Sequence, residues 1–111
     1  MKFKGNKGEN LAVKFLQEKG YKILTRNFRS HFGEIDIIAE KDGITIFVEV
    51  KFREGNSYGK PNEAVSNQKI KKIIKTANFW IAKIGEEIPC RFDVITISSD
   101  KIKHIENAFT I

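Results

Sequence analysis

Away from its central turn, the apolar stretch GEIDIIAEKDGITIFVEVK (residues 33–51) is interrupted by four charged side chains: Glu34, Asp36, Glu49 and Lys51. Carboxylates that converge can hold a divalent cation. Magnesium takes oxygen ligands, typically from one or two carboxylates, and fills its other positions with water and substrate phosphate. A lysine beside such an ion could steer an attacking water or neutralise the charge that develops as a phosphodiester is cleaved. The chemistry open to these residue types is therefore metal-assisted hydrolysis.

The dipeptide Asp42-Gly43 at the centre of this stretch sets the geometry that the acids would have. Asp-Gly is a strong signal for a two-residue type I′ turn, which would pair Lys41 with Ile44 and fix the register of a hairpin. Counting outward from that pair places Asp36 opposite Glu49, with Cβ atoms about 5 Å apart. Two carboxylates at that distance repel, so one should stay protonated unless a cation lies between them.

The same register assigns each side chain of the hairpin to one face of a sheet, since side chains alternate along a strand. Glu34 would lie opposite Lys51. The charged face would hold Glu34, Asp36, Ile38, Phe47, Glu49, Lys51 and Arg53. The apolar face would hold Ile35, Ile37, Ile46, Val48, Val50 and Phe52.

Glu9 is a further acid that is expected to point toward this site. Residues 6–19 have the apolar spacing of a helix, and Glu9 shares one helical face with Ala12 and Leu16. It should therefore face the sheet together with apolar residues, where a carboxylate needs a partner. Water bound to a metal ion could be that partner.

An alternative interpretation treats these charges as ordinary surface pairs. Glu34 opposite Lys51 would be a common cross-strand ion pair, and alternating charges usually mark a solvated sheet face. Two features argue against it. Asp36 opposite Glu49 is a destabilising like-charge pair, and Glu9 occupies a sheet-facing position.

The rest of the chain must position these residues, and its pattern predicts two helices and five strands. The first helix, 6–19, stops at Gly20, and the second has Ser66 as its N-cap and ends near Gly85. Strands are expected over 21–31, 33–40, 44–53, 91–98 and 101–106, with a loop over 54–62. The order α-β-β-β-α-β-β predicts a single α/β domain over residues 1–111, with helices flanking a mixed central sheet.

Composition narrows the partners and the compartment. The 111 residues carry a net charge of +6, which favours an anionic partner, with nucleic acid first and an acidic membrane surface second. The single cysteine, Cys90, excludes an internal disulfide and argues against zinc-ribbon and zinc-finger sites. No apolar run approaches the ~18 residues of a membrane span, and no secretory signal is visible. We therefore expect a cytoplasmic protein that does not enter membranes.

The arrangement resembles the PD-(D/E)XK nuclease superfamily, in which a restriction-endonuclease-like α-β-β-β-α-β core presents one acid on a strand and E-x-K on the next. Asp36 in GEID matches the first acid, and Glu49-Val50-Lys51 matches E-x-K. Glu9 matches a first-helix acid of the archaeal Holliday-junction resolvases. Ile35 stands where the superfamily has a proline, which is not a ligand.

More closely, the chain is similar to the YraN-like family of small bacterial endonuclease-like proteins, at residues 8–9, 33–36, 47–51, 58–59 and 91–94 and in the second helix. The resemblance implies a Mg²⁺ or Mn²⁺ ion held by Asp36, Glu49 and the Val50 carbonyl, with Lys51 and Glu9 completing the catalytic site. It also implies a nucleic-acid substrate, with DNA, including branched DNA, as the first candidate. A homodimer would suit two symmetric cuts in such a substrate.

Basic and aromatic residues around the hairpin are candidates for holding nucleic acid. Phosphates could bind Arg26, Arg29, His31, Arg53 and Lys60, and a base or strand end could stack on Tyr58. A generic basic surface and a tyrosine packed on its own domain are the alternatives. Gln68 is a weaker site candidate at the start of the second helix. The lysines at 69, 71, 72 and 75 are expected to form a solvated helix face, and Asp93 is expected to be structural, paired with a nearby arginine.

Three functions follow from these observations. A metal-dependent nuclease would cleave DNA only with Mg²⁺ or Mn²⁺, and replacing Asp36 or Lys51 by alanine would abolish cleavage. A nucleic-acid-binding protein with a nuclease fold but no turnover would show salt-sensitive binding alone. A structural or adaptor protein would lose stability when Asp36 is changed to asparagine, since its hairpin charges would be surface ion pairs.

Overall fold

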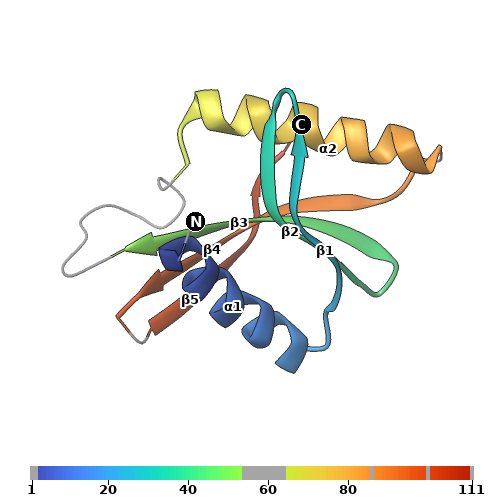
Figure 1. Cartoon of the computed structure of the whole chain (residues 1–111). Coiled ribbons are helices and arrows are strands. Elements are labelled where there is room, and N and C mark those ends of the chain that lie inside the picture. The colour runs from blue at the N-terminus through green and yellow to red at the C-terminus, as the bar shows by residue number, and fades with distance from the viewer. Residues whose placement is uncertain (1–2, 54–64, 86, 100, 111) are drawn as a thin grey trace.

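A computed structural model describes residues 3–53, 65–85, 87–99 and 101–110, except the side chains of residues 3–7 and of Arg53. The elements follow in the order α1 (Phe3–Glu18), β1 (Lys22–Ser30), β2 (Gly33–Lys41), β3 (Ile44–Arg53), α2 (Asn67–Ile84), β4 (Cys90–Ser98) and β5 (Lys101–Phe109), as Figure 1 shows. The expected α-β-β-β-α-β-β order is therefore confirmed. The loop expected over 54–62 lies outside the described residues.

The strands form one five-stranded mixed sheet in the order β1-β2-β3-β4-β5, so β3 is the central strand. The β3–β4 pair is parallel, and the other three pairs are antiparallel. This α/β arrangement is consistent with an α-β-β-β-α-β nuclease-like core. Neither helix of the described chain is long and apolar enough to cross a membrane.

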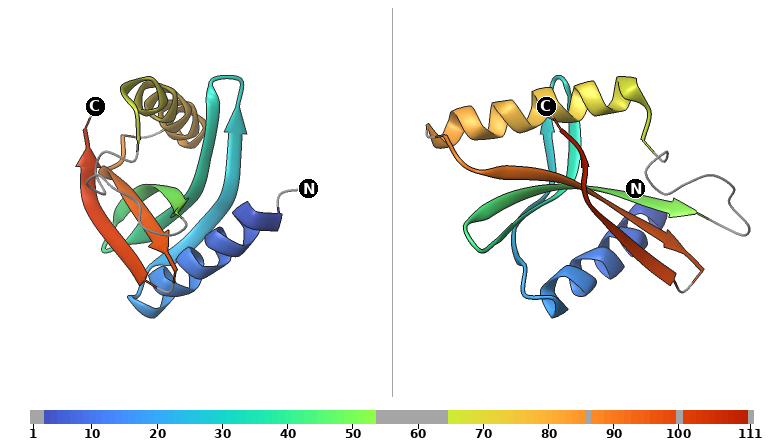
Figure 2. Two further views of the ribbon diagram at one scale, coloured as in Figure 1. Left: turned by 90° about the vertical axis from the view of Figure 1, so that its left-hand side faces the viewer. Right: turned by 180° about the vertical axis from the view of Figure 1, so that it is seen from behind.

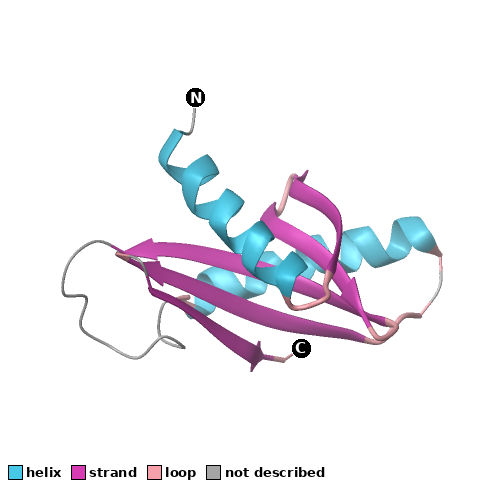
Figure 3. Ribbon diagram, turned by 90° about the horizontal axis from the view of Figure 1, so that it is seen from below, coloured by secondary structure: helices cyan, strands magenta, loops and turns pink. Residues whose placement is uncertain are grey.

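The two helices cover opposite faces of the sheet (Figures 2 and 3). On the α1 face, Ala12 and Leu16 pack with the buried side chains of Ile37, Ala39, Ile46, Val48, Ile95 and Ile97. On the α2 face, Ile73 and Ala77 pack with Ile35, Ile38, Phe47, Phe92 and Val94. The strands from β2 to β4 are therefore buried on both faces, as their continuous apolar runs require.

Both helices end where the sequence predicts. Gly20 follows α1 with φ +91°, and Gly85 caps α2 in the left-handed region with φ 81°, where a residue with a Cβ would be strained. Ser66 is the N-cap of α2, and its side-chain oxygen accepts a hydrogen bond from the backbone N–H of Lys69. This bond satisfies one of the free backbone N–H groups in the first turn of α2.

The turn between β2 and β3 has the geometry that Asp-Gly predicts. Asp42 and Gly43 have φ values of 53° and 79°, as a type I′ turn requires, and Lys41 pairs with Ile44. The predicted register holds from that pair to the pairing of Ile37 with Val48, where the described ladder ends.

The face assigned to Ile35 is wrong. Ile35 packs on the α2 face, whereas Ile37 packs on the α1 face, although the two residues should share a face by simple alternation. The neighbouring strand β1 has Asn27 in the left-handed region with φ 52° at the same level, between the pairs formed by Ile37 and by Ile35. The hairpin of β1 and β2 twists sharply there and rises toward α2 (Figure 1), which carries Ile35 to the other face.

Candidate metal centre

A pocket opens where β2 and β3 part, beyond the last paired residues of their ladder. It has a volume of about 240 Å³. It is lined by Gly8, Glu9, Glu34, Asp36, Glu49, Val50, Lys51, Phe52 and Lys69. Residues from α1, β2, β3 and the first turn of α2 therefore meet at one end of the sheet. The four charged residues of the hairpin, Glu34, Asp36, Glu49 and Lys51, all line this pocket.

Where β2 and β3 separate, the side chain of Asp36 takes the place of a backbone hydrogen bond between the two strands. Its Oδ2 accepts a hydrogen bond of 2.8 Å from the backbone N–H of Val50 on the neighbouring strand. This bond satisfies a main-chain donor that the ended ladder would otherwise leave without a partner. The aspartate thus holds β3 while leaving its second oxygen at the pocket.

The carboxyl groups of Asp36 and Glu49 lie together in this pocket. The pKa of Asp36 is raised to about 7, first by burial and then by the charge of Glu49 and a hydrogen bond to the Glu49 side chain, while the bond from Val50 acts in the opposite direction. Glu49 is only 5% exposed, and its buried Oε1 has no hydrogen-bond partner among the residues that the structure describes. A protein normally partners such a buried oxygen. The negative charges of these two side chains therefore repel each other in the pocket.

These residues fit a small, hard divalent cation. Such an ion would relieve the repulsion that holds the pKa of Asp36 high, and it would give the buried Glu49 Oε1 a partner. Within the described ranges, no three histidine, cysteine, aspartate or glutamate side chains form a metal cluster. Magnesium suits two carboxyl groups because it keeps several waters of its own.

Glu9 brings a fourth carboxyl group to the pocket, after those of Glu34, Asp36 and Glu49, and it comes from α1. It is 8% exposed, and Arg26 Nη2 lies 3.8 Å from its Oε1. Burial raises the pKa of Glu9, as does the charge of Asp36, while a hydrogen bond with Asn27 and the charge of Arg26 lower it. Glu9 therefore faces the sheet, as the helical spacing predicts.

The expected pairing of Glu34 with Lys51 across the strands is not part of the described ladder, which ends before both residues. Arg29 Nε instead donates to Glu34 Oε2 at 2.9 Å. Lys51 is half-buried and lines the pocket beside the two carboxyl groups.

Lys69 is a site residue that the sequence argument missed. The sequence predicts a solvated position for Lys69 on α2, but its Nζ lies 3.4 Å from Glu49 Oε2 in the pocket. One signal could have found it. Lys69 stands four residues before the buried Ile73 and one turn after the N-cap Ser66, so it points toward the sheet at the end of the helix that meets β3. Lys71, Lys72 and Lys75 are exposed, as expected.

Some of the candidate nucleic-acid-binding residues lie beside the pocket in the structure, and others lie away from it. Arg26 lies beside Glu9 and donates to Asn10 Oδ1 at 2.7 Å, and Arg29 reaches Glu34, so both flank the pocket. His31 lies in the turn between β1 and β2, with its ring 4.1 Å from that of Phe32, away from the lining residues. Gln68 is exposed at the start of α2 and does not line the pocket. Tyr58, Lys60 and the side chain of Arg53 lie outside the described part of the chain.

Asp93 has the structural role that the sequence predicts. It is fully buried, and Arg91 donates to its two oxygens at 2.8 and 2.9 Å. His104 Nε2 lies 2.7 Å from Asp93 Oδ2, and the backbone N–H of Asn107 donates to Oδ1. Although burial raises the pKa of Asp93, the hydrogen bonds with His104 and Arg91 lower it overall. This network joins β4 to β5.

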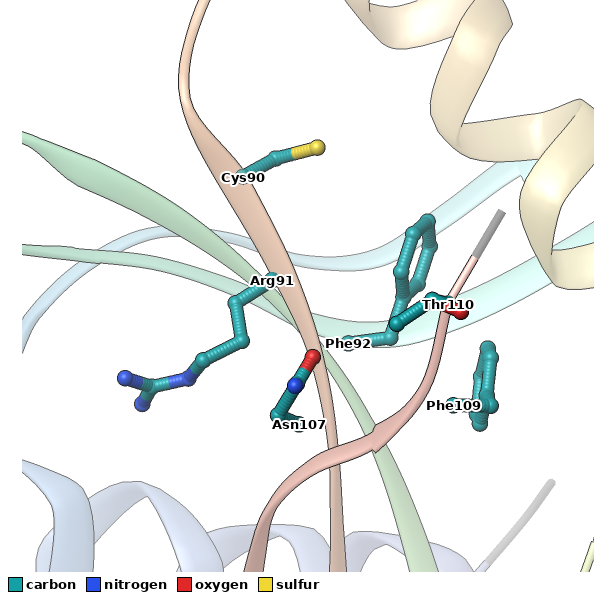
Figure 4. Close-up of a pocket in the computed structure, with 6 residues that line it drawn as sticks. All are labelled: Cys90, Arg91, Phe92, Asn107, Phe109 and Thr110. Atoms are coloured by element: carbon teal, nitrogen blue, oxygen red, sulfur yellow. The ribbon is translucent and has the colours of Figure 1, made fainter.

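A second pocket, of about 160 Å³, lies beside β4 and the end of β5 (Figure 4). Its lining residues are Cys90, Arg91, Phe92, Asn107, Phe109 and Thr110, none of them acidic. The rings of Phe92 and Phe109 stack 5.1 Å apart, and the Arg91 side chain points away from Phe109. This pocket offers no ligand set for a hard cation, so the acidic pocket is the candidate metal centre.

Comparison with known proteins shows similarity along almost the whole chain. The model of a family described as "Uncharacterised protein family UPF0102" matches residues 8–97, which include every lining residue of the acidic pocket. A UPF0102 protein of Persephonella marina is 49% identical over 111 residues, covering 97% of this chain and 94% of the relative. One of Thermodesulfovibrio yellowstonii is 50% identical over 105 residues, covering 95% and 94%. One of Geobacter metallireducens is 47% identical over 112 residues, covering 96% and 92%.

Proposed function

The chain belongs to the uncharacterised protein family UPF0102, and from that premise we propose that it is a metal-dependent nuclease that cleaves phosphodiester bonds in DNA. The expected likeness to the YraN-like family is thereby confirmed, whereas membership of the PD-(D/E)XK superfamily is part of the proposal. One observation carries it. The carboxyl groups of Asp36 and Glu49 share a pocket at the parting of two strands, together with Lys51, and the charge of Glu49 helps to raise the pKa of Asp36.

Each residue has a role that follows from its position. Asp36 and Glu49 would hold Mg²⁺ or Mn²⁺, with the Val50 carbonyl as a third protein ligand. The bound ion would supply the positive charge that polarises the scissile phosphate. The Lys51 ammonium would orient the attacking water and offset the negative charge that develops in the transition state. Glu9 would accept a hydrogen bond from water at the edge of the site.

The charge of the chain supports a nucleic-acid substrate. The net charge is +6 even though four acids line the pocket, so the basic residues lie mostly elsewhere on the surface and can bind phosphates. Arg26 and Arg29 flank the pocket and can position a phosphodiester over it. Branched DNA is the substrate that we propose to test first, and a homodimer would suit paired cuts.

Cleavage itself is the direct test. Linear, flapped and four-way DNA should be cut in the presence of Mg²⁺ or Mn²⁺, and chelation with EDTA should stop cutting. The Asp36→Ala variant should be inactive, since it removes an ion ligand and the acceptor for the Val50 N–H. Persistent cutting by that variant would contradict the site. Failure to cut any of these substrates, or their RNA equivalents, with either ion would contradict the reaction.

The ion pair between Lys69 and Glu49 favours a second candidate function. Lys69 Nζ lies 3.4 Å from Glu49 Oε2, so it neutralises part of the acid pair without a metal ion. A protein that binds nucleic acid through the same fold but performs no turnover would need such an internal cation. The two candidates differ in whether Glu49 is available to a metal.

We expect the Lys69→Met variant to bind Mn²⁺ about two- to fivefold more tightly than the wild type. Methionine removes the competing ammonium, and a partly exposed ion pair of this kind is worth about 0.5–1 kcal/mol. Isothermal titration calorimetry with Mn²⁺ measures the effect, with Lys71→Met as the control because Lys71 is exposed on the same helix. Unchanged or weaker binding would show that Lys69 does not compete with the ion for Glu49.

A further inference from the structure

Helix α2 is a concentrated source of positive charge. Its sequence, NQKIKKIIKTANFWIAKI, contains five lysines and no acid, in a chain whose net charge is +6. Lys72, Lys75, Phe79 and Lys83 follow one another at intervals of three or four residues, so they form one stripe along the helix. The stripe is distinct from the buried residues Ile73, Thr76 and Ala77.

This stripe lies beside the turn between β1 and β2. Figure 2 shows the turn of this hairpin beside α2. At the contact, a Cβ added to Gly33 would lie 3.3 Å from the Cβ of Lys72, so the hairpin backbone sits directly against the helix. We call the surface formed by Phe32, Lys72, Lys75, Phe79 and Lys83 the α2 seam.

Aromatic rings and ammonium groups alternate along the α2 seam. Lys75 Nζ lies 5.7 Å from the centre of the Phe32 ring, and Lys83 Nζ lies 5.1 Å from that of Phe79. Phe32 is 37% exposed and Phe79 36% exposed, which is high for phenylalanine. Rings held at the surface beside cations are the pattern that binds bases by stacking and phosphates by charge.

The α2 seam is continuous with the acidic pocket. Lys69, which contacts Glu49 in the pocket, is one turn before Lys72 on the same helix. From Lys69 to Lys83 the helix rises about 21 Å, at about 1.5 Å per residue. A nucleic-acid strand with one phosphodiester at the pocket would therefore extend along this row of cations.

We propose that the α2 seam is a track that holds a single-stranded segment of nucleic acid next to the acidic pocket. The inference rests on the proposed function for its substrate class, and it adds the form of the substrate and the direction in which the strand runs. A single strand fits because its bases are free to stack on Phe32 and Phe79, whereas those of a duplex are paired and stacked. A flapped or branched DNA supplies such a segment beside a duplex.

An acidic membrane surface is the competing partner for a basic helix, and the packing of α2 disfavours it. Amphipathic helices bind membranes by burying their apolar face among the lipids. The apolar face of α2 is already buried against the sheet, with Ile73 3% and Ala77 0% exposed. The two partly exposed rings of the seam offer little apolar area in its place.

Neutralising two seam lysines tests the electrostatic part of the proposal. We expect the Lys75→Gln/Lys83→Gln variant to bind a fluorescent 20-nucleotide oligo-dT roughly ten- to thirtyfold more weakly at about 0.1 M salt. The slope of log affinity against log salt should fall by about 1.4, since each lost phosphate contact removes about 0.7. Fluorescence anisotropy in EDTA measures binding without any cleavage. The control is Lys101→Gln/Lys103→Gln, which removes the same charge from two exposed positions of β5.

Removing a ring tests the stacking part separately. Phe32→Ala should weaken oligo-dT binding about tenfold, as one lost stacking contact predicts, while leaving the salt slope unchanged. Leu24→Ala, at another exposed apolar position, should have no effect.

Several outcomes would overturn the track. The β5 variant could lose as much affinity as the seam variant, or the seam variants could bind oligo-dT like the wild type. The lysine variant could also lose binding to phosphatidylserine vesicles while its oligonucleotide binding is unchanged.

The proposed reaction can fail independently of the track. Binding through the seam without cleavage in Mg²⁺ or Mn²⁺ would remove the nuclease and keep the track. Metal-dependent cleavage by seam variants at the wild-type rate would remove the track and keep the nuclease.

Discussion

Replacing Asp36 by asparagine should stabilise the metal-free protein above pH 7, with the gain disappearing below about pH 4. The folded protein raises the pKa of this carboxyl from 3.8 to about 7. At low pH the carboxyl group is neutral in both the folded and the unfolded chain, so it does not lower the free energy of unfolding. As the pH rises from 4 to 7, the unfolded chain ionises more readily, and the wild type loses stability that a neutral asparagine keeps.

The size of this effect follows from the size of the pKa shift. About three pKa units correspond to about 4 kcal/mol, and we expect a gain of about 1–4 kcal/mol in the free energy of unfolding above pH 7. Asparagine can still accept the hydrogen bond from the Val50 N–H, and it can donate to Glu49 instead of repelling it.

Chemical denaturation in EDTA between pH 4 and pH 8 measures the gain. Asp42→Asn is the matched control, because Asp42 is exposed in a turn with φ 53° that asparagine also tolerates. Its stability should follow that of the wild type at every pH. A loss of stability in Asp36→Asn above pH 7 would show that Asp36 serves as a partner in a structural ion pair, as in an adaptor protein. Added Mg²⁺ should stabilise the wild type more than Asp36→Asn.

Replacing Lys51 by methionine should lower the rate constant for DNA cleavage by about 10²–10⁴-fold. Methionine keeps most of the apolar stem and removes the ammonium of a side chain that lines the same pocket as the two carboxyl groups. Losing one group that stabilises charge or moves a proton in the transition state costs about this factor. Mn²⁺ should still bind, because its ligands are unchanged.

Single-turnover cleavage of a flapped DNA with saturating Mn²⁺ measures this rate. Lys22→Met on β1 is the control, since it removes an exposed lysine that pairs with Glu40, at the other end of β2 from the pocket. Wild-type turnover by Lys51→Met would show that Lys51 takes no part in the reaction. A large fall in Mn²⁺ affinity would instead assign it a role in shaping the ion site.

Local signals predicted most of the fold. Ser66, Gly85 and Asp42-Gly43 each fix a helix end or a turn through their own backbone preferences, and the structure has each where expected. The register of the β2–β3 hairpin followed from the turn alone, because pairing is counted from it. The sheet-facing position of Glu9 followed from helical spacing, which is also a local property.

The features that sequence reasoning missed depend on distant parts of the chain. The switch of Ile35 to the α2 face arises where β1, with Asn27 at φ 52°, twists together with β2, and neither strand shows this on its own. Lys69 reaches Glu49 because the start of α2 lies over the end of the central strand. The order of strands in the sheet decides that placement, and the order is a property of the whole fold.

The hydrogen bond from the Val50 N–H to Asp36 also bears on which divalent ions the site would select. With Oδ2 engaged by the main chain, Asp36 has only Oδ1 left to offer, so it would act as a monodentate ligand. Calcium favours six to eight oxygens and often takes both from one carboxylate, while magnesium needs six in a tighter octahedron. By tying down one oxygen, the backbone of the central strand itself would discriminate against the larger ion.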